Sequence, residues 1–414
     1  MIDELPEFST KIIIVLCSLI IYDDFTLKHT KLRNLLLLLQ KYKADLAFII
    51  LIAMTGFEER GMAIFSTSFT AGTAAVFLWQ SLFYSPVIAS ITFSFLSIAC
   101  ILALTKNEFK RGFHIIILPL LCGIVCGLTS LNIPYVGESF IKEITSPIGE
   151  AMKRAISKLP FTNKENNELI KALITGDRNH LSPETYKAFR DSGAAHILAL
   201  SGFHLGIIYL VLSKLLLPLG NNPRTRKIKS VLLIMMTGIY SFSTGGAPSI
   251  IRAFIFICLR EIAKILEREI SLKQIFFTAL CLQLIFSPRS ITSIGFQLSY
   301  LAVAGIVYIY PHLKKCYPDE REDKSWMKSI WNTAVMSISC QTATTPVVWI
   351  VFKTFPKYFL LTNNIAIPLT SIIIPMAIII TLLNILGLCP MILIEALEFL
   401  LNNLVFSLNI ISSM

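Results

Sequence analysis

The chain has 414 residues, of which 54% are hydrophobic and 15% are charged. Several nearly continuous apolar runs reach about 20 residues, the length that spans a bilayer, so the sequence excludes an ordinary soluble domain and predicts an integral membrane protein. The formal net charge of +11 is what basic loops on the cytoplasmic side of a multi-spanning protein produce, and it leaves open a path for an acidic polymer.

Hydropathy predicts an all-α fold, a polytopic transmembrane helical bundle of about 10 or 11 spans. We leave open that the run 196–220 begins as a re-entrant element, because glycine and histidine lie near its beginning. The run 356–387 contains Pro368 and Pro375 and is expected to be kinked or interrupted. The predicted spans are 62–82, 84–104, 113–133, 196–220, 229–245, 247–264, 274–289, 291–313, 329–352, 356–387 and 388–412.

The same pattern divides the chain into four segments. Residues 1–60 contain no apolar run long enough to span a bilayer alone, so no structure is assigned to them. Residues 61–135 hold the N-terminal spans and residues 136–195 are extracytoplasmic amphipathic helices. Residues 196–414 form the main bundle.

Lysines and arginines gather in alternate loops and predict an orientation. We assign the basic loops to the cytoplasm, because the intervening short loops hold little beyond Arg289, Lys353 and Lys357. Parity then places the polar segment 134–195 outside. The basic loops contain Lys106, Lys110 and Arg111; Arg224, Arg226, Lys227 and Lys229; Arg260, Lys264, Arg268 and Lys273; and Lys314, Lys315, Arg321, Lys324 and Lys328.

The segment 136–195 has the pattern of ordered helices. Isoleucines recur at helical spacing along its first part, which indicates an amphipathic helix lying on the bilayer or on the bundle. Thr162 with Glu165 matches a capping box, and Gly176 supplies a stop. Ser182 is a typical N-cap for the next helix.

The nine cysteines do not point to a metal site. None forms a CxxC pair, and Cys122 and Cys126, one helical turn apart, have no histidine or carboxylate on the same span. Known metal sites need fuller ligand sets than this. Neither a metal nor another cofactor is therefore expected.

The stretch FRDSGAAHILALSGFHLGIIYL places His196 and His204 where a polar helix gives way to an apolar one. Imidazole inside an apolar run marks a candidate functional site. Ser201 and His204 are three residues apart, so on a helix they share a face. Three interpretations remain open: a pore-lining element in which Gly202 allows close backbone approach, a Ser–His nucleophile pair, and a histidine buried for packing alone.

A second candidate lies in STGGAPSIIRAFIFICLR. Gly245, Gly246 and Pro248 end one helix and begin another, leaving helix-terminal amides unpaired. Arg252 follows one turn later and keeps its charge, so it must snorkel to the surface, find a carboxylate or line a polar path. A helix N-terminus with an arginine is also a reasonable phosphate site.

Polar residues recur deeper in the bundle, near glycine or proline breaks. Gln297 lies in GFQLSYLAV, Gln341 in SCQTATTPVV and Asn364 in LLTNNIAIPL. One such residue usually joins two helices, whereas several suit a water-filled route. No aspartate or glutamate is expected well inside the spans between residues 196 and 387. That absence disfavours a proton- or cation-driven transporter.

Six sequence motifs follow one another in the C-terminal part of the chain: ALITGDRNHLSPETYKAF, GAAHILALSGFHLGII, APSIIRAFIF, SPRSITSIGFQLSYLAV, QTATTPVVW and NNIAIPL. In order and spacing, residues 169–387 resemble the membrane channel domain of the ComEC-type competence proteins of bacteria. Longer members of that family often carry an OB-like domain and a metallo-β-lactamase-like domain. Neither pattern is visible in this sequence, and no HxHxDH motif occurs.

The resemblance implies a non-enzymatic, multi-pass channel of the bacterial inner membrane, through which one strand of DNA enters the cytoplasm during natural transformation. The implied partners are single-stranded DNA and the lipid bilayer, with a DNA receptor, a cytoplasmic helicase or other ATPase, a separate nuclease and further copies of the chain. Such a passage needs polar or cationic walls and stacking surfaces. The candidate path residues are His196, Ser201, Gly202, His204, Arg252, Gln297, Gln341 and Asn364, and the candidate stacking residues are Phe203, Phe296 and Tyr300.

Two other functions remain open. The first is a transporter or flippase for another anionic solute or lipid, which loss of DNA uptake on deletion would separate from a DNA channel. The second is an intramembrane hydrolase that uses Ser201 and His204, which labelling of Ser201 by a serine-reactive phosphonate would favour.

Overall fold

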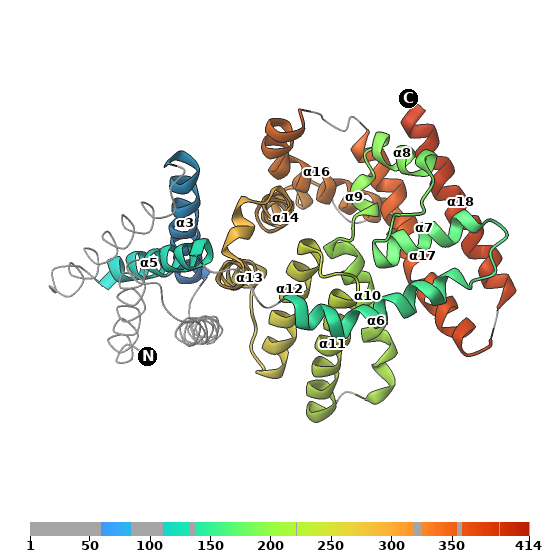
Figure 1. Cartoon of the computed structure of the whole chain (residues 1–414), viewed down its shortest axis with the longest axis horizontal. Coiled ribbons are helices and arrows are strands. Elements are labelled where there is room, and N and C mark those ends of the chain that lie inside the picture. The colour runs from blue at the N-terminus through green and yellow to red at the C-terminus, as the bar shows by residue number, and fades with distance from the viewer. Residues whose placement is uncertain are drawn as a thin grey trace. The chain divides into compact units, whose positions relative to one another are not determined.

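The computed structural model describes residues 59–83, 111–132, 138–220, 222–317, 325–353, 358–388 and 390–413. These residues form helices joined by short loops, with no β-strand among them (Figure 1). The predicted span 84–104 and nearly all of the segment 1–60 lie outside the described residues. The elements are α3 (Glu59–Phe83), α5 (Arg111–Asn132), α6 (Glu138–Ser157), α7 (Lys164–Thr175), α8 (Pro183–Asp191), α9 (Ala195–Leu198), α10 (Gly202–Leu215), η2 (Leu217–Leu219), α11 (Pro223–Ser243), α12 (Pro248–Ile265), α13 (Leu272–Phe286), η3 (Pro288–Thr292), α14 (Ile294–Ala304), η4 (Gly305–Ile309), α15 (Tyr310–Lys314), α16 (Ser325–Phe352), α17 (Phe359–Ile385) and α18 (Met391–Ser413).

The predicted class, a polytopic helical membrane protein, is confirmed. Within the described part of the chain, five helical stretches are long and apolar enough to cross a membrane. Shorter apolar helices, including Gly202–Leu215 and Leu272–Phe286, match further predicted spans. The five long stretches are Glu59–Leu78, Ile294–Lys314, Met327–Phe352, Phe359–Ile385 and Met391–Ser413.

The chain divides into two compact units. The first consists of Met1–Val136 and Glu269–Phe296, and its described helices include α3, α5 and α13. A Cβ atom at Gly72 of α3 would lie 2.1 Å from the carbonyl oxygen of Leu120 on α5. Glycine therefore permits the close backbone approach that is typical of packed membrane helices.

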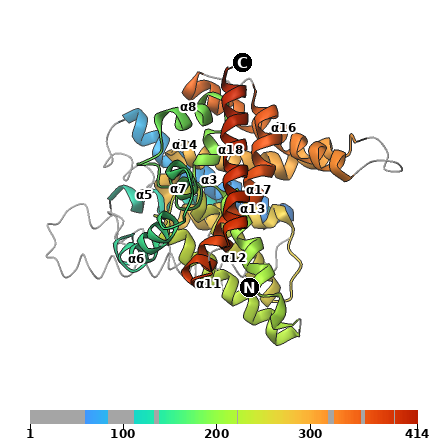
Figure 2. The same ribbon diagram turned by 90° about the vertical axis from the view of Figure 1, so that its right-hand side faces the viewer.

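The second unit consists of Gly137–Arg268 and Gln297–Met414. Within it, α17 and α18 lie side by side (Figures 1 and 2). Six residues of α18 are buried at intervals of three or four residues, so one face of this apolar helix packs on the unit and the other is left for lipid. The buried residues are Ile394, Leu397, Leu401, Leu404, Leu408 and Ile411.

Hydrogen bonds and ion pairs bring the basic loops of this unit together. At the start of α11, Lys227 pairs with Glu267 beyond the end of α12 at 3.3 Å. The Oγ of Ser230 also donates to Glu261 of α12 at 2.7 Å. The loops before α11 and after α12 therefore share one end of the helix bundle, as the predicted orientation requires.

The helices of residues 136–195 begin and end close to where the sequence indicates. Ser182 caps α8 by accepting the N–H of Thr185 at 3.2 Å, and Gly176 ends α7 with φ 75°. The predicted capping box is wrong by one residue, because the N-cap is Asn163, whose Oδ1 accepts the N–H of Glu165 at 3.0 Å. The Glu165 carboxylate instead accepts the hydroxyls of Ser182 and Thr185, which joins α7 to α8.

The long apolar run near the C-terminus is a single helix. α17 extends from Phe359 to Ile385 through Pro368 and Pro375, so the expected interruption does not occur. In a packed membrane bundle, neighbouring helices and side chains can compensate for the hydrogen bonds that proline removes. The sequence alone does not show which neighbouring groups lie beside these prolines.

Candidate functional site

The SGFH motif, residues 201–204, lies at a break between two helices. α9 ends at Leu198 and α10 begins at Gly202, and Ser201 between them is the N-cap, with extended backbone (φ −126°, ψ 172°). The Oγ of Ser201 lies 3.0 Å from Nδ1 of His204, and the N–H of Ser201 donates to the same nitrogen at 3.4 Å. Ser201 and His204 thus lie together, as their spacing predicts, and they cap the start of α10.

The two histidines have different surroundings. His204 is 1% exposed and packs edge-on against Phe203, with 5.8 Å between ring centres. His196 on α9 is exposed, and its Nδ1 lies 3.1 Å from the carbonyl oxygen of Gly193. No described residue forms a hydrogen bond to Nε2 of His204. Because a catalytic triad needs a group that orients the imidazole, this geometry suits a helix cap better than a nucleophile pair.

Arg252 is buried near the start of α12. The helix begins at Pro248, after Gly245 and Gly246 turn the chain with φ 89° and 62°. Arg252 is only 4% exposed, and its Cζ lies 5.9 Å from the centre of the Tyr300 ring, within cation–π range. This burial disfavours the snorkelling interpretation, because a snorkelling side chain ends in water.

The starts of α10 and α12 lie next to each other. A Cβ atom at Gly202 would lie 3.4 Å from Cβ of Ala253. The Oγ of Ser249 donates to the carbonyl oxygen of Leu200 at 2.5 Å. The structure therefore brings the SGFH cap and the buried arginine to neighbouring positions, although 48 residues separate His204 from Arg252 in the sequence.

The deeper polar residues lie on three other helices of the second unit. Gln297 is on α14, one turn before Tyr300, Gln341 is on α16 and Asn364 is on α17, and all three are half-buried. The Nδ2 of Asn364 donates to the carbonyl oxygen of Leu360 at 3.1 Å. Its buried Oδ1 accepts no hydrogen bond from any described residue. A buried oxygen without a donor is unusual, so this position of α17 is a candidate functional position.

These helices form a closed circuit of contacts within the second unit. α10 packs against α12 and α17, and α16 packs against α17 and η4. η4 is one turn of π-helix, a feature frequent at functional sites, and a Cβ atom at its Gly305 would lie 2.3 Å from the carbonyl oxygen of Ser339 on α16. Arg252 over Tyr300 closes the circuit between α12 and α14. Among the predicted path residues, only His196, on α9, lies off it.

The predicted stacking residues differ in their exposure. Phe296 belongs to the first unit and is 4% exposed. In the second unit, Tyr300 is 6% exposed and lies against Arg252, whereas Phe203 is half-buried. Tyr300 therefore faces a cation, which leaves little of its surface open to a base.

Glu261 on α12 is a buried acid that the sequence analysis missed. It is 1% exposed, and its Oε1 accepts the hydroxyl of Tyr209 at 2.6 Å and the ammonium of Lys264 at 2.5 Å. Its Oε2 accepts the hydroxyl of Ser230 at 2.7 Å. Glu261 lies near the end of α12, beside the basic loop, so it does not contradict the expectation that no carboxylate lies well inside the spans. Lys264 balances its charge, and hydroxyls of α10 and α11 satisfy its oxygens. The i,i+3 spacing of Glu261 and Lys264 was the available signal.

The fold and the site define a multi-spanning helical membrane protein with polar groups inside its bundle. The model of the competence protein family matches residues 173–414, more than half of the chain. This range includes the SGFH cap, Arg252 and the polar residues of α14, α16 and α17. The chain therefore belongs to the competence protein family.

Individual relatives match shorter stretches. ComE operon protein 3 of Bacillus subtilis (strain 168) is 31% identical over 150 residues, which are 34% of this chain and 18% of that protein. Competence protein ComA of Neisseria gonorrhoeae is 24% identical over 204 residues, 48% of this chain and 28% of that protein. The chain thus spans less than a third of the length of either relative. No solved structure matches the chain.

Proposed function

We propose that the chain is an inner-membrane channel for single-stranded DNA taken up during natural transformation. Membership of the competence family supports a role in DNA uptake at the level of the family. One structural observation supports the channel itself, namely the closed circuit of α10, α12, α14, α16 and α17. The circuit carries a buried cation, a buried histidine and amide side chains, which are suitable groups for a polar route through a bilayer.

The proposal includes an orientation and a set of partners. The basic end of α10, α11 and α12 faces the cytoplasm, and the short helices α6 to α8 lie on the outer side. A DNA receptor delivers the strand outside, a cytoplasmic helicase or other ATPase supplies the motor force, and a separate nuclease removes the other strand. The chain works as a single copy or as a homo-oligomer.

Deletion and complementation in a transformable host test the proposal. We expect deletion of the gene to abolish entry of labelled DNA into a nuclease-resistant cytoplasmic pool, and the whole chain to restore it. Binding of DNA at the cell surface should persist, because the receptor is a different protein. Normal entry of DNA in the deletion strain would contradict the channel and favour a transporter for another anionic solute or lipid.

The chain is further proposed to move DNA without cutting it. Phosphodiester hydrolysis needs a metal ion or equivalent charge stabilisation, with an activated nucleophile. Among the described residues, no cluster of three or more His, Cys, Asp or Glu could hold a metal. We expect the purified protein to bind single-stranded DNA with an affinity that falls steeply with salt, and to release no nucleotides with magnesium, manganese or zinc. Metal-dependent cleavage that disappears in His204→Ala would overturn this proposal.

A further inference from the structure

The basic end of the second unit exposes a group of leucines. α10 ends at Leu215, and the chain passes through the short turn η2 to Gly220 before α11 begins at Pro223. No residue of η2 is buried, and Leu217 is 62% exposed. A group of large apolar side chains on such a turn marks a surface that a partner covers. The exposed leucines are Leu215, Leu217, Leu219 and, just beyond the end of α12, Leu266.

Two contacts hold this turn beside the ends of α11 and α12. The Nζ of Lys229, in the second turn of α11, donates to the carbonyl oxygen of Leu217 at 3.5 Å. Lys227 pairs with Glu267, the residue after Leu266, at 3.3 Å. α10 also packs against both helices (Figure 1). The exposed leucines therefore gather at one end of these three helices.

Bases outnumber acids at this end. Residues 210–230 include five bases and no acid, and residues 259–268 include three bases and two acids. Each of the two acids already pairs with a lysine of the same end. An excess of positive charge is therefore left for an acidic partner.

Two arginines of this end have unused hydrogen-bond donors. The side chains of Arg224 and Arg226 are exposed, and neither forms a hydrogen bond or an ion pair with a described residue. Both follow Gly220 by a few residues, so they lie close to the exposed leucines. Guanidinium groups bind phosphate through paired N–H donors. We call the four exposed leucines and these two arginines the η2 surface.

An apolar face of α11 continues from the η2 surface. Its members recur every three or four residues, and each is about half exposed. Arg224 precedes the first of them by four residues, so it lies on the same face. An exposed apolar face on a helix of a membrane protein is covered by lipid chains. A positive charge thus lies at the end of a lipid-covered face, which consists of Ile228, Val231, Met235 and Ile239.

The charge and the apolar area together select an amphiphile with an acidic head. A DNA strand supplies phosphates, but its bases stack on aromatic rings, and residues 210–230 and 259–268 contain no aromatic residue. Free phosphate would leave the leucines without a partner. A zwitterionic lipid has no net charge to match the excess of bases. An anionic phospholipid satisfies both parts, with its chains on the leucines and its phosphate on the arginines.

We propose that the η2 surface binds an anionic phospholipid of the surrounding bilayer. The headgroup phosphate binds Arg224 and Arg226, and the acyl chains cover the exposed leucines and the apolar face of α11. In the proposed orientation this lipid belongs to the cytoplasmic leaflet. The inference goes beyond the proposed channel and does not depend on the passage of DNA.

Native mass spectrometry of the full chain in detergent tests this, with dioleoyl phosphatidylglycerol and dioleoyl phosphatidylcholine as probes. The two lipids have the same chains and differ in headgroup charge. We expect phosphatidylglycerol to bind about tenfold more tightly, because each arginine beside an anionic headgroup strengthens binding several-fold. Leu217→Ser with Leu219→Ser should weaken the binding of both lipids, because the double variant removes apolar surface.

Charge variants test the headgroup contact. Arg224→Gln with Arg226→Gln should bring the two affinities to within about twofold of each other. The matched control is Lys158→Gln with Lys164→Gln, at the junction of α6 and α7, which also removes two exposed charges and should keep the full preference. All four side chains are exposed, so the unfolding temperature should not change in either variant.

Equal affinity for the two lipids, or the same preference in the arginine variant, would overturn the inference. So would unchanged lipid binding by the leucine variant, or an equal loss of preference in the lysine control. Displacement of phosphatidylglycerol by inorganic phosphate would show a simple anion site instead, and displacement by oligothymidine would assign the surface to DNA. The assay contains no transport step, so a chain that takes up no DNA can still bind the lipid.

Discussion

Glu261→Leu is expected to be among the most destabilising single substitutions in the second unit. The change removes the acceptor shared by Tyr209, Ser230 and Lys264. Ser230 is 3% exposed, so its hydroxyl would stay buried without this partner, whereas Lys264 can turn toward water. Hydrogen bonds to a charged group contribute about 1.5–3 kcal/mol each, so losing the bonds from Tyr209 and Ser230 costs about 3–6 kcal/mol. The loss should appear as a lower unfolding temperature in detergent, with much less monodisperse protein.

Two further variants distinguish the loss of the Glu261 charge from the loss of its hydrogen-bond acceptors. Glu261→Gln keeps an oxygen for the hydroxyls and should cost less, about 1–3 kcal/mol. Glu168→Leu is the matched control, because Glu168 pairs with Lys171 at the same i,i+3 spacing but with 25% of its side chain exposed. That loss should stay below about 1 kcal/mol. Equal unfolding temperatures for Glu261→Leu and Glu168→Leu would show that the buried network does not hold α10, α11 and α12 together.

The helices were predictable from the sequence because the bilayer imposes a length and a composition on each span. The runs 329–352 and 388–412 correspond closely to α16 and α18. Caps were predictable where they depend on local chain geometry, as at Ser182. The cap of α7 is Asn163 and not Thr162. The Glu165 carboxylate, which would complete the predicted capping box, instead bonds to α8, and this is a tertiary contact.

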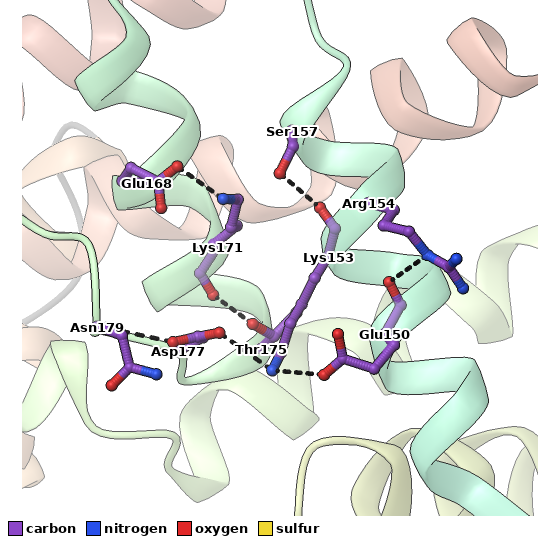
Figure 3. Close-up of polar contacts among 9 residues, drawn as sticks. All are labelled: Glu150, Lys153, Arg154, Ser157, Glu168, Lys171, Thr175, Asp177 and Asn179. Carbon is purple, nitrogen blue, oxygen red and sulfur yellow. Dashed lines mark hydrogen bonds and ion pairs between the residues drawn. The ribbon is translucent and has the colours of Figure 1, made fainter.

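The site was only partly predictable, because several of its contacts join residues that are distant in the sequence. The spacing of Ser201 and His204 placed them on one face, and the structure shows that the pair caps α10. The ring beneath Arg252 belongs to Tyr300, 48 residues later, and no local pattern indicates that contact. The burial of Glu261 was not predictable, because the hydroxyls of Tyr209 and Ser230 that bond to it come from α10 and α11. Likewise, the ion pair at 3.0 Å between Lys153 of α6 and Asp177 after α7 forms only in the folded chain (Figure 3).

Arg252→Gln is expected to abolish DNA uptake while leaving the folded protein in the membrane. Arg252 is buried against Tyr300 in the circuit of helices, and a fixed cation in a low-dielectric route stabilises a passing phosphate. Each 1.4 kcal/mol of this stabilisation that is lost slows passage about tenfold, so the loss of several kcal/mol abolishes measurable uptake. A desolvated cation–π contact contributes about 2 kcal/mol to folding, which is small beside the total stability of a folded unit, so expression should persist. Uptake of labelled DNA per molecule of membrane-inserted protein measures the effect.

Variants at Arg252 and at a second arginine of α12 test whether the geometry and the position of the positive charge matter. Lysine keeps the charge but not the planar, bidentate geometry of the guanidinium, so Arg252→Lys should retain an intermediate rate of uptake. Arg260 lies two turns later on α12 and is exposed at the basic end. Arg260→Gln removes the same charge from the chain and should leave uptake close to normal. Normal uptake in Arg252→Gln would mean that Arg252 only packs against Tyr300. Equal losses in Arg252→Gln and Arg260→Gln would mean that total positive charge matters, and not a cation at this point of the route.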